Sequence, residues 1–444
     1  SVLFTDEFME AVLNKKKFRL HFECKDTGEN IEKWIDARKF FKHFCEVAWD
    51  MGDPGVLFND RIQQHNFNPN RPSYHISTSN PCSEFLGADY SSCNLGSINV
   101  YSFVRNKFRT DAFFDYKAFC GTVVKAVMAL NDVLSYGYDK QPLPENKKCI
   151  DDWRQIGLGL FGLADAFVAL RIKYGSEESI KFVDTLLRTM HDMALRASVG
   201  EAIQFGSYGK FFKGILPTVD NDLMTIEELD SVMKHGMANA SLLSIAPTGT
   251  MSLFMGNFTG GCEPIFKLFY DRSTHKMEKT GDSFRVYARS IEDLLNYNGL
   301  SLDMSVEEIK DVFPWVVEAH DIPWASRVIL QSTMQKYVDN AISSTVNLPH
   351  DATVDDVFNI YIAAWRSGCK GITVFRDGCR RGNILGVEEK KEKVEPKTAE
   401  PAPKKPTCSG DADYRECPEC HEKLFKVEGH CGYCVGCGYS ACGM

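Results

Sequence analysis

Asn80, Cys82 and Glu84 occupy alternate positions in the stretch NPCSE, and Cys93 follows eleven residues after the first cysteine. In an extended segment the side-chain period is two, so we expect these three side chains to point to the same side. An amide, a thiol and a carboxylate are costly to bury together unless they have a function. The alternative is an ordinary Asn-Pro turn in which Cys82 is a small buried hydrophobe.

The stretch IGLGLFGLAD has the spacing G-x-G-x-x-G at Gly157, Gly159 and Gly162. A dinucleotide site needs this loop between a strand and a helix, with an acid about twenty residues further on at a second strand end. The preceding segment NKKCIDDWRQ is polar, and the acids Glu177 and Glu178 fall at a predicted helix start. We therefore expect close helix packing over small residues rather than NAD binding.

The segment 241–254, SLLSIAPTGTMSLF, combines an apolar run with the start of a predicted helix. Pro247 suits a first helical turn, and Thr248 and Thr250 are able to cap it. Free N–H groups at such a helix start, with Gly249 allowing close approach, would suit a phosphate group. A plain strand-to-helix turn explains the pattern equally well.

The C-terminal region contains six of the sixteen cysteines. Cys417 and Cys420 form one C-x-x-C pair, and Cys431 and Cys434 form a second pair ten residues later. Two such pairs can meet tetrahedrally around zinc. This spacing predicts a structural zinc site in a small zinc-ribbon-like unit.

Two further cysteines of this region, Cys437 and Cys442, are left over near the end of the sequence. A cysteine pair that forms and exchanges a disulfide is what a thiol shuttle requires. The zinc register stays open, because Cys434 and Cys437 could equally be the second zinc pair. The leftover thiols could also be incidental.

Helical and strand-like patterns alternate along most of the chain. Apolar residues at helical spacing predict helices over 31–51, 114–134, 179–205 and 356–366. Strand-like runs cover 97–104, 242–246 and 371–375. This alternation predicts an α/β fold with largely parallel strands.

Composition changes sharply at Gly386. We expect a catalytic α/β portion over 1–386, a flexible linker rich in charge, Pro and Ala over 387–413, and the cysteine-rich tail over 414–444. The net charge of −9 gives no general attraction to nucleic acid or anionic membrane. We see no run approaching eighteen apolar residues and no secretory signal, so we expect a cytoplasmic protein with metal and redox roles for its cysteines.

Several motifs together, and in this order, resemble the adenosylcobalamin-dependent (class II) ribonucleotide reductases. They are NPCSE, CNLGSIN, RQIGLGLFGLAD, SIAPTGT and GCKGITVFRDGCR, followed by the cysteine-rich tail. The resemblance covers roughly residues 50–442. It implies a ten-stranded α/β barrel with a radical-cysteine loop at its centre, a ribonucleotide substrate, and adenosylcobalamin as cofactor.

The resemblance also implies roles for the opening residues. Cys82 would become a thiyl radical and abstract the 3′-hydrogen of the ribose, and Glu84 would accept the 3′-hydroxyl proton as general base. Asn80 would hold the sugar hydroxyls, and Cys93 would be one of two thiols that reduce the substrate. These roles agree with the chemistry of the residues, because a general base must lie within hydrogen-bond reach of the ribose.

Further implications concern the phosphates, the radical source and the tail. The substrate phosphates would bind at Pro247, Thr248, Gly249, Thr250 and Met251. Class I enzymes carry a radical-relaying tyrosine pair in the strand that matches GITVFR, whereas this chain has Val374 and Phe375. Cys437 and Cys442 would carry electrons from a thioredoxin- or glutaredoxin-like reductant.

The sequence departs from the family in one respect, since only 79 residues precede NPCSE. We therefore expect the C-terminal part of a reductase, which would need an N-terminal half and would form a homodimer when complete. A split gene product, a fragment and a segment downstream of an excised intein all remain open. Two alternatives also stay open, a class I-type subunit with an external metallocofactor and a non-catalytic zinc-tailed interaction protein.

Overall fold

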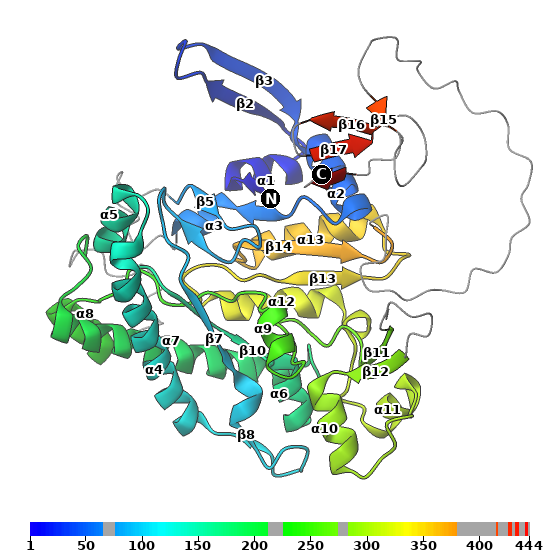
Figure 1. The fold of residues 1–444 in the computed structure, drawn as a ribbon. Coiled ribbons are helices and arrows are strands. Elements are labelled where there is room, and N and C mark those ends of the chain that lie inside the picture. Colours follow the sequence, from blue (N-terminus) through cyan, green and yellow to red (C-terminus); the bar gives the residue numbers. More distant parts are fainter. Residues whose placement is uncertain are drawn as a thin grey trace, which may run out of the picture. The chain divides into compact units, whose positions relative to one another are not determined.

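The computed structural model describes residues 1–64, 76–211, 225–273, 283–379, 414–415, 425–428, 431–434 and 440–442 (Figure 1). The chain divides into two compact units, Ser1–Ile384 and Leu385–Met444. The smaller unit contains four antiparallel strands in the order β15, β16, β17 and β18. Their bounds are Tyr414–Arg415, Phe425–Glu428, Cys431–Cys434 and Ser440–Cys442.

The larger unit is built around two groups of strands. One sheet has the order β1 (Val2–Phe4), β4 (Val56–Phe58), β14 (Gly371–Arg376) and β13 (Thr345–Leu348). Its neighbours are parallel except for β4 and β14, which run antiparallel. The second group pairs β7 (Leu95–Asn99) with β10 (Gly157–Phe161) in parallel.

Two single bridges continue the parallel order beyond β10. Leu158 pairs with Leu243, and Ile245 pairs with Ile342, just before β13 begins. The described strands form an open arrangement and not a closed barrel. The predicted α/β fold with largely parallel strands is confirmed, but the strand-like run 242–246 forms bridges only, and the run 97–104 is interrupted by a 3₁₀ turn over Val100–Phe103.

Helices α4 (Tyr116–Gly137), α7 (Glu177–Phe205) and α13 (Val354–Arg366) confirm three of the predicted helices. The remaining helices are α1 (Asp6–Leu13), α2 (Ala37–Met51), α3 (Asn59–Gln64), α5 (Pro144–Trp153), α6 (Leu163–Leu170), α8 (Ile226–His235), α9 (Gly249–Phe254), α10 (Arg289–Tyr297), α11 (Val306–Val312) and α12 (Trp324–Gln335). Short strands complete the unit, namely β5 (Thr78–Ser79), β6 (Leu86–Gly87), β8 (Val104–Arg105), β9 (Phe113–Phe114), β11 (Phe269–Ser273) and β12 (Ser283–Tyr287).

The predicted helix over 31–51 is wrong in its first third. Strand β3 (Asn30–Asp36) pairs there with β2 (Lys17–Glu23) in an antiparallel hairpin. The helix begins only after Asp36, whose side chain accepts a hydrogen bond from the backbone N–H of Lys39 as an N-cap. The alternation in IEKWID therefore prevails over helical spacing in this segment.

Helix α4, together with the 3₁₀ turn that follows it (Tyr116–Lys140), has the length and composition of a membrane span, although we expected no such segment. In this structure it packs beside α7. Its inward stripe is buried, and consists of Phe119, Val123, Val127, Leu130 and Leu134. The helix is thus one wall of the larger hydrophobic core.

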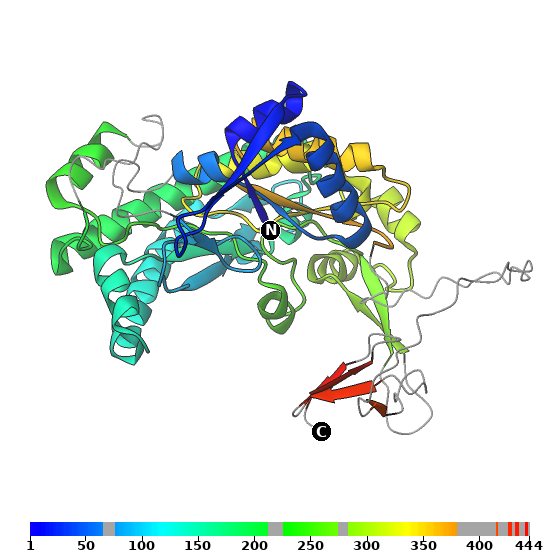
Figure 2. The same ribbon diagram turned by 90° about the horizontal axis from the view of Figure 1, so that it is seen from above.

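A second core cluster lies where α2 and α13 pack side by side against β14 (Figure 1 and Figure 2). Phe41 on α2 is fully buried there, with the ring of Phe358 at 5.6 Å and that of Phe4 at 5.3 Å, each edge-on. The adjacent Phe40 is 42% exposed. This cluster holds the β4–β14 junction from one side.

We expect Phe41→Ala to lower the free energy of unfolding by about 3–5 kcal/mol, because it leaves a cavity in this cluster. Phe40→Ala is the matched control and should cost less than about 1 kcal/mol, since its ring is already partly in water. Urea denaturation followed by circular dichroism measures both changes. Equal losses for the two variants would contradict the assignment of this core.

Candidate functional site

The stretch NPCSE is a tight turn between β5 and β6, not the extended segment that we predicted. The Ser83 N–H donates to the Asn80 carbonyl at 3.0 Å, and Ser83 has a left-handed φ of 64°. The Phe85 N–H donates to Asn80 Oδ1 at 3.1 Å. The period-two expectation is therefore wrong, and the side chains of Cys82 and Glu84 meet different surroundings, Cys82 being exposed and Glu84 buried.

The Asn80 side chain has a structural task in this turn. Its oxygen closes the turn, and its amide nitrogen, which is a donor, is the group left for a contact with a ligand oxygen. Such a nitrogen can donate to a hydroxyl oxygen. The predicted role of Asn80 in holding sugar hydroxyls stays a prediction.

Glu84 is the most deeply buried of the predicted catalytic residues, with 3% of its surface exposed. Its main-chain carbonyl accepts hydrogen bonds from Ser244 Oγ at 2.8 Å and from the Ala341 N–H at 2.9 Å. Its carboxylate atom Oε2 is buried and has no hydrogen-bond partner among the described residues. Buried polar atoms are normally paired, so this oxygen is suited to a ligand that brings its own donor.

The thiols of Cys82 and Cys93 lie within the electrostatic reach of Glu84. Burial first, and then the negative charge of Glu84, raises the pKa of both thiols above the ordinary cysteine value. Both residues are nevertheless exposed on this chain, with Cys93 just ahead of β7. The structure thus brings together one carboxylate and two accessible, protonated thiols.

Within the predicted phosphate segment, which begins at Pro247, Thr248 has a left-handed φ of 51° and directly precedes α9. Its side chain does not cap the helix as we predicted, because Oγ1 accepts the Gly261 N–H at 2.9 Å instead. Gly249, Thr250 and Met251 are exposed in the first turn. The first N–H groups of a helix have no partner within the helix, so this turn offers donors to solvent or to a ligand.

The segment Gly260–Gly261 supports this turn from behind. A Cβ atom added to Gly261, which has φ +47°, would lie 2.6 Å from the carbonyl oxygen of Ala246. A Cβ atom on Gly260 would lie 2.3 Å from that of Pro247. Only glycine therefore permits the two segments to approach this closely.

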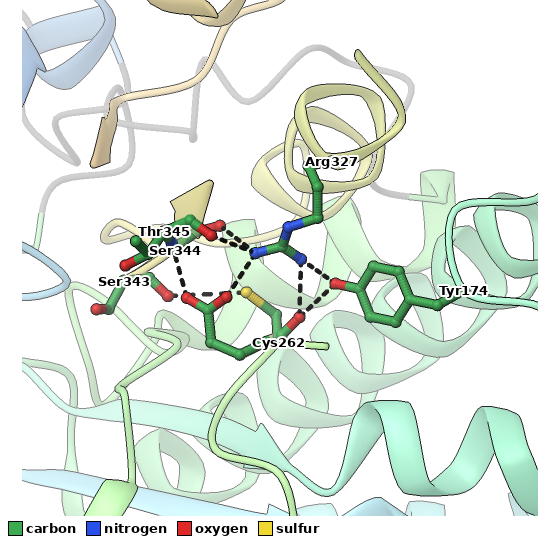
Figure 3. Close-up of polar contacts among 7 residues, drawn as sticks. Tyr174, Cys262, Arg327, Ser343, Ser344 and Thr345 are labelled. Carbon is green, nitrogen blue, oxygen red and sulfur yellow. Dashed lines mark hydrogen bonds and ion pairs between the residues drawn. The ribbon is translucent and has the colours of Figure 1, made fainter. Parts of the chain in front are cut away.

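A buried ion pair fixes the residues that follow these glycines (Figure 3). Arg327 on α12 is 3% exposed, and its Nη2 atom lies 2.6 Å from Glu263 Oε2. The same nitrogen donates at 3.1 Å to Ser344 Oγ and to the Thr345 carbonyl. The Thr345 N–H in turn donates to Glu263 Oε1 at 2.7 Å, which ties β13 to the glycine segment.

Tyr174 completes this network from the opposite side. Its hydroxyl donates to the Cys262 carbonyl at 2.5 Å and accepts from Arg327 Nη1. Burial raises the pKa of the Cys262 thiol to about 12, so this cysteine is protonated and inert. No local motif predicts this network, because its members lie far apart along the chain.

Part of the predicted zinc and shuttle set in the tail lies outside the described residues. Cys417, Cys420 and Cys437 lie outside the described residues, and only the backbone is described for Cys431, Cys434 and Cys442. The ladder of β17 and β18 places Cys431 opposite Cys442. In the part of the chain whose side chains are described, no three His, Cys, Asp or Glu residues gather as a metal ion would require.

We expect Glu84→Gln to lower the pKa of the Cys82 thiol, because it removes the negative charge that disfavours the thiolate. The pH profile of Cys82 alkylation by iodoacetamide, followed by peptide mass spectrometry, should move to lower pH. Asp89→Asn, an exposed acid of the same hairpin, is the control and should leave the profile in place. An unchanged profile in Glu84→Gln would show that the carboxylate is not beside this thiol.

Comparison with known proteins gives a family for this chain. The family model "Ribonucleotide reductase, barrel domain" matches residues 1–375. The "Vitamin B12-dependent ribonucleoside-diphosphate reductase" of Mycobacterium tuberculosis (strain CDC 1551 / Oshkosh) is 34% identical over 399 residues, which are 87% of this chain and 53% of the relative. The protein of that name from Thermoplasma acidophilum is 30% identical over 422 residues, or 91% and 51% of the two chains.

A "Vitamin B12-dependent ribonucleotide reductase" from Streptomyces clavuligerus is 27% identical over 439 residues, which cover 88% of this chain and 44% of the relative. The chain thus spans about half the length of the curated relatives it matches. The family match covers the cysteine turn, the predicted phosphate segment and all of β14 except its last residue, Arg376. The chain therefore belongs to the ribonucleotide reductase barrel-domain family.

Proposed function

We propose that this chain carries the reaction centre of a ribonucleotide reductase. In the overall reaction the 2′-hydroxyl of a ribonucleotide leaves as water and a hydrogen takes its place. Two thiols supply the two electrons and become a disulfide. The product is the 2′-deoxyribonucleotide, a precursor for DNA synthesis.

The observation that carries this proposal is the buried, unpaired oxygen of Glu84, a residue whose charge reaches the thiols of Cys82 and Cys93. A buried carboxylate with a free oxygen can accept a ribose hydroxyl and take its proton, which is the task of the general base. Cys82 would abstract the 3′-hydrogen, and Cys93 would be one of the two reducing thiols. The Asn80 amide nitrogen would donate to a sugar hydroxyl.

The nucleotide would be oriented by its phosphates. The first turn of α9 would bind them through the residues Pro247, Thr248, Gly249, Thr250 and Met251. The exposed residues Gly249, Thr250 and Met251 in the first turn of this helix support the assignment. The Thr248–Gly261 hydrogen bond would hold the turn in its binding conformation.

Adenosylcobalamin is the cofactor that suits these residues. The relatives from Mycobacterium, Thermoplasma and Streptomyces are named vitamin B12-dependent. The Cys82 thiol is exposed and therefore accessible to a bound cofactor, and β14 offers Val374 and Phe375 rather than phenol side chains. When bound, the cofactor would supply the radical chemistry that converts the Cys82 thiol into a thiyl radical.

Residues 1–386 would be the catalytic portion, and they would form the second part of a ten-stranded barrel. Open strand edges support this, because they are stable when paired or covered. An N-terminal half would complete the barrel, and the complete enzyme would be a cytoplasmic homodimer. The tail over 414–444 would bind zinc through Cys417, Cys420, Cys431 and Cys434 and exchange disulfides through Cys437 and Cys442, on the linker 387–413.

We expect Cys82→Ser to abolish deoxyribonucleotide formation when the chain is complemented with the N-terminal half of a relative. Turnover should be lost because a hydroxyl is poorly suited to reversible hydrogen transfer. Nucleotide binding should be nearly unchanged because a hydroxyl is similar in size to a thiol. Chromatographic product analysis with adenosylcobalamin and a dithiol measures the effect. Cys24→Ser, in the β2–β3 hairpin, is the control and should keep full activity. A few per cent of residual activity in Cys82→Ser would place the radical elsewhere.

The double variant Cys437→Ser, Cys442→Ser should support one turnover of the pre-reduced complemented protein and then stall with a thioredoxin-like reductant. The physical reason is that a large reductase cannot enter a closed barrel, whereas a tethered dithiol can. Dithiothreitol should restore multiple turnover by replacing the tail. Normal cycling with the protein reductant would show that this pair is not the shuttle.

A further inference from the structure

Ser244 is a buried polar residue that the proposed reaction leaves without a task. Its side chain is 1% exposed, and Oγ donates to the Glu84 carbonyl at 2.8 Å across a separation of 160 residues. The Ala341 N–H donates to the same oxygen at 2.9 Å. The residue that bears the proposed general base is therefore held by its backbone from two other segments.

Gly157 and Gly159, from the glycine motif, make room for Ser244. A Cβ atom on Gly159 would lie 2.4 Å from the Ser244 carbonyl oxygen, and one on Gly157 would lie 2.8 Å from the Ser244 Cβ atom. These glycines allow a close approach, but the packing against a helix that we expected is wrong, because the neighbour is the strand-like segment that bears Ser244. The motif is also part of strand β10 rather than a loop that follows one.

The segment that bears Ser244 is itself fixed on both sides. The Ser244 N–H donates to the Leu158 carbonyl at 3.1 Å. Asp339 Oδ2 accepts the N–H groups of Leu242 and Leu243 at 3.0 and 2.9 Å. The buried Lys370 donates to the Asp339 carbonyl. Ser244 thus presents its hydroxyl from a rigid support.

We propose that Ser244 is a positioning residue that holds Glu84 and the Cys82 turn through the Glu84 carbonyl. Gly157 and Gly159 leave the space in which the Ser244 residue packs. The carbonyl bond fixes the Cα atom of Glu84 and so limits where its carboxylate can lie. Cys82 is only two residues away, across the left-handed Ser83. The effect on turnover rests on the proposed function, whereas the effect on the turn does not.

The test is Ser244→Ala in the full chain, with the pH profile of Cys82 alkylation as the readout. Loss of the bond should loosen the turn and move Glu84 away from the thiol, so the profile should shift to lower pH. Ser241→Ala is the matched control, because that buried hydroxyl on the same segment donates to the Ile156 carbonyl instead. An unchanged profile in Ser244→Ala, or an equal shift in Ser241→Ala, would overturn the proposal.

A double-mutant cycle separates positioning from a general loss of packing. If Ser244 acts through Glu84, the shift caused by Glu84→Gln should be smaller in the Ser244→Ala background than in the intact chain. Additive shifts would overturn the proposal. In the complemented enzyme we expect Ser244→Ala to reduce turnover roughly tenfold, whereas nucleotide affinity should change little. If Ser244→Ala shifts the pH profile of Cys82 alkylation as expected but the complemented protein without substitutions shows no turnover, the proposed function is refuted and the positioning role of Ser244 stands.

A second variant and a second measurement apply if Ser244→Ala does not fold. Gly159→Ala should displace the Ser244 backbone and shift the profile in the same direction, whereas Gly96→Ala on β7 meets only the Leu130 side chain at 3.4 Å. In the intact chain, the Ala341 amide should resist hydrogen exchange as strongly as that of Ile245, which donates to the Ala341 carbonyl. Rapid exchange of the Ala341 amide would show that its hydrogen bond to the Glu84 carbonyl does not hold the turn, and would overturn the proposal.

Discussion

The Glu84 carbonyl, which accepts hydrogen bonds from Ser244 and Ala341, determines where the reactive groups of this chain can lie. Burying a carboxylate with an unpaired oxygen is unfavourable, and a mobile turn would relieve this cost by moving the side chain into water. Two donors from rigid segments prevent that movement. The turn is therefore held in an arrangement that its own sequence would not favour, which is a common property of functional sites.

One short segment links this anchor to the predicted phosphate site. Ser244 holds Glu84, and Thr248, only four residues later, opens α9 and binds the Gly261 N–H. The Arg327–Glu263 pair fixes the backbone behind Gly261. A ribonucleotide carries its phosphates on the 5′ carbon of its sugar, so the sugar and phosphate subsites must keep a suitable separation, and a short rigid segment between them would maintain it. Such pre-organisation is what proximity catalysis requires.

Local sequence patterns predicted the helices and strands that are fixed by their own residues, but not those that depend on contacts with distant segments. Helix α13 was predictable because its apolar stripe and the acids after Thr353 agree with each other. Strand β3 (Asn30–Asp36) was mistaken for helix, because its apolar residues also fit helical spacing and its pairing with β2 cannot be seen in its own sequence. Residue type alone made Cys82 and Glu84 candidates, and their roles stay a prediction, whereas the tight turn that holds them was not predicted. Arg327 and Tyr174 are 153 residues apart, so no local signal could connect them.

The central claim is that Glu84 holds a free carboxylate oxygen for the 3′-hydroxyl of a ribonucleotide. Calorimetry on the complemented protein tests it by comparing the affinities for a ribonucleoside diphosphate and for its 3′-deoxy analogue. The same two affinities are measured for the Glu84→Gln variant. A hydrogen bond to a charged group contributes about 1.5–3 kcal/mol, so the intact protein should prefer the ribonucleotide by about tenfold or more. We predict that Glu84→Gln removes most of this preference. An equal preference in both proteins would contradict the account.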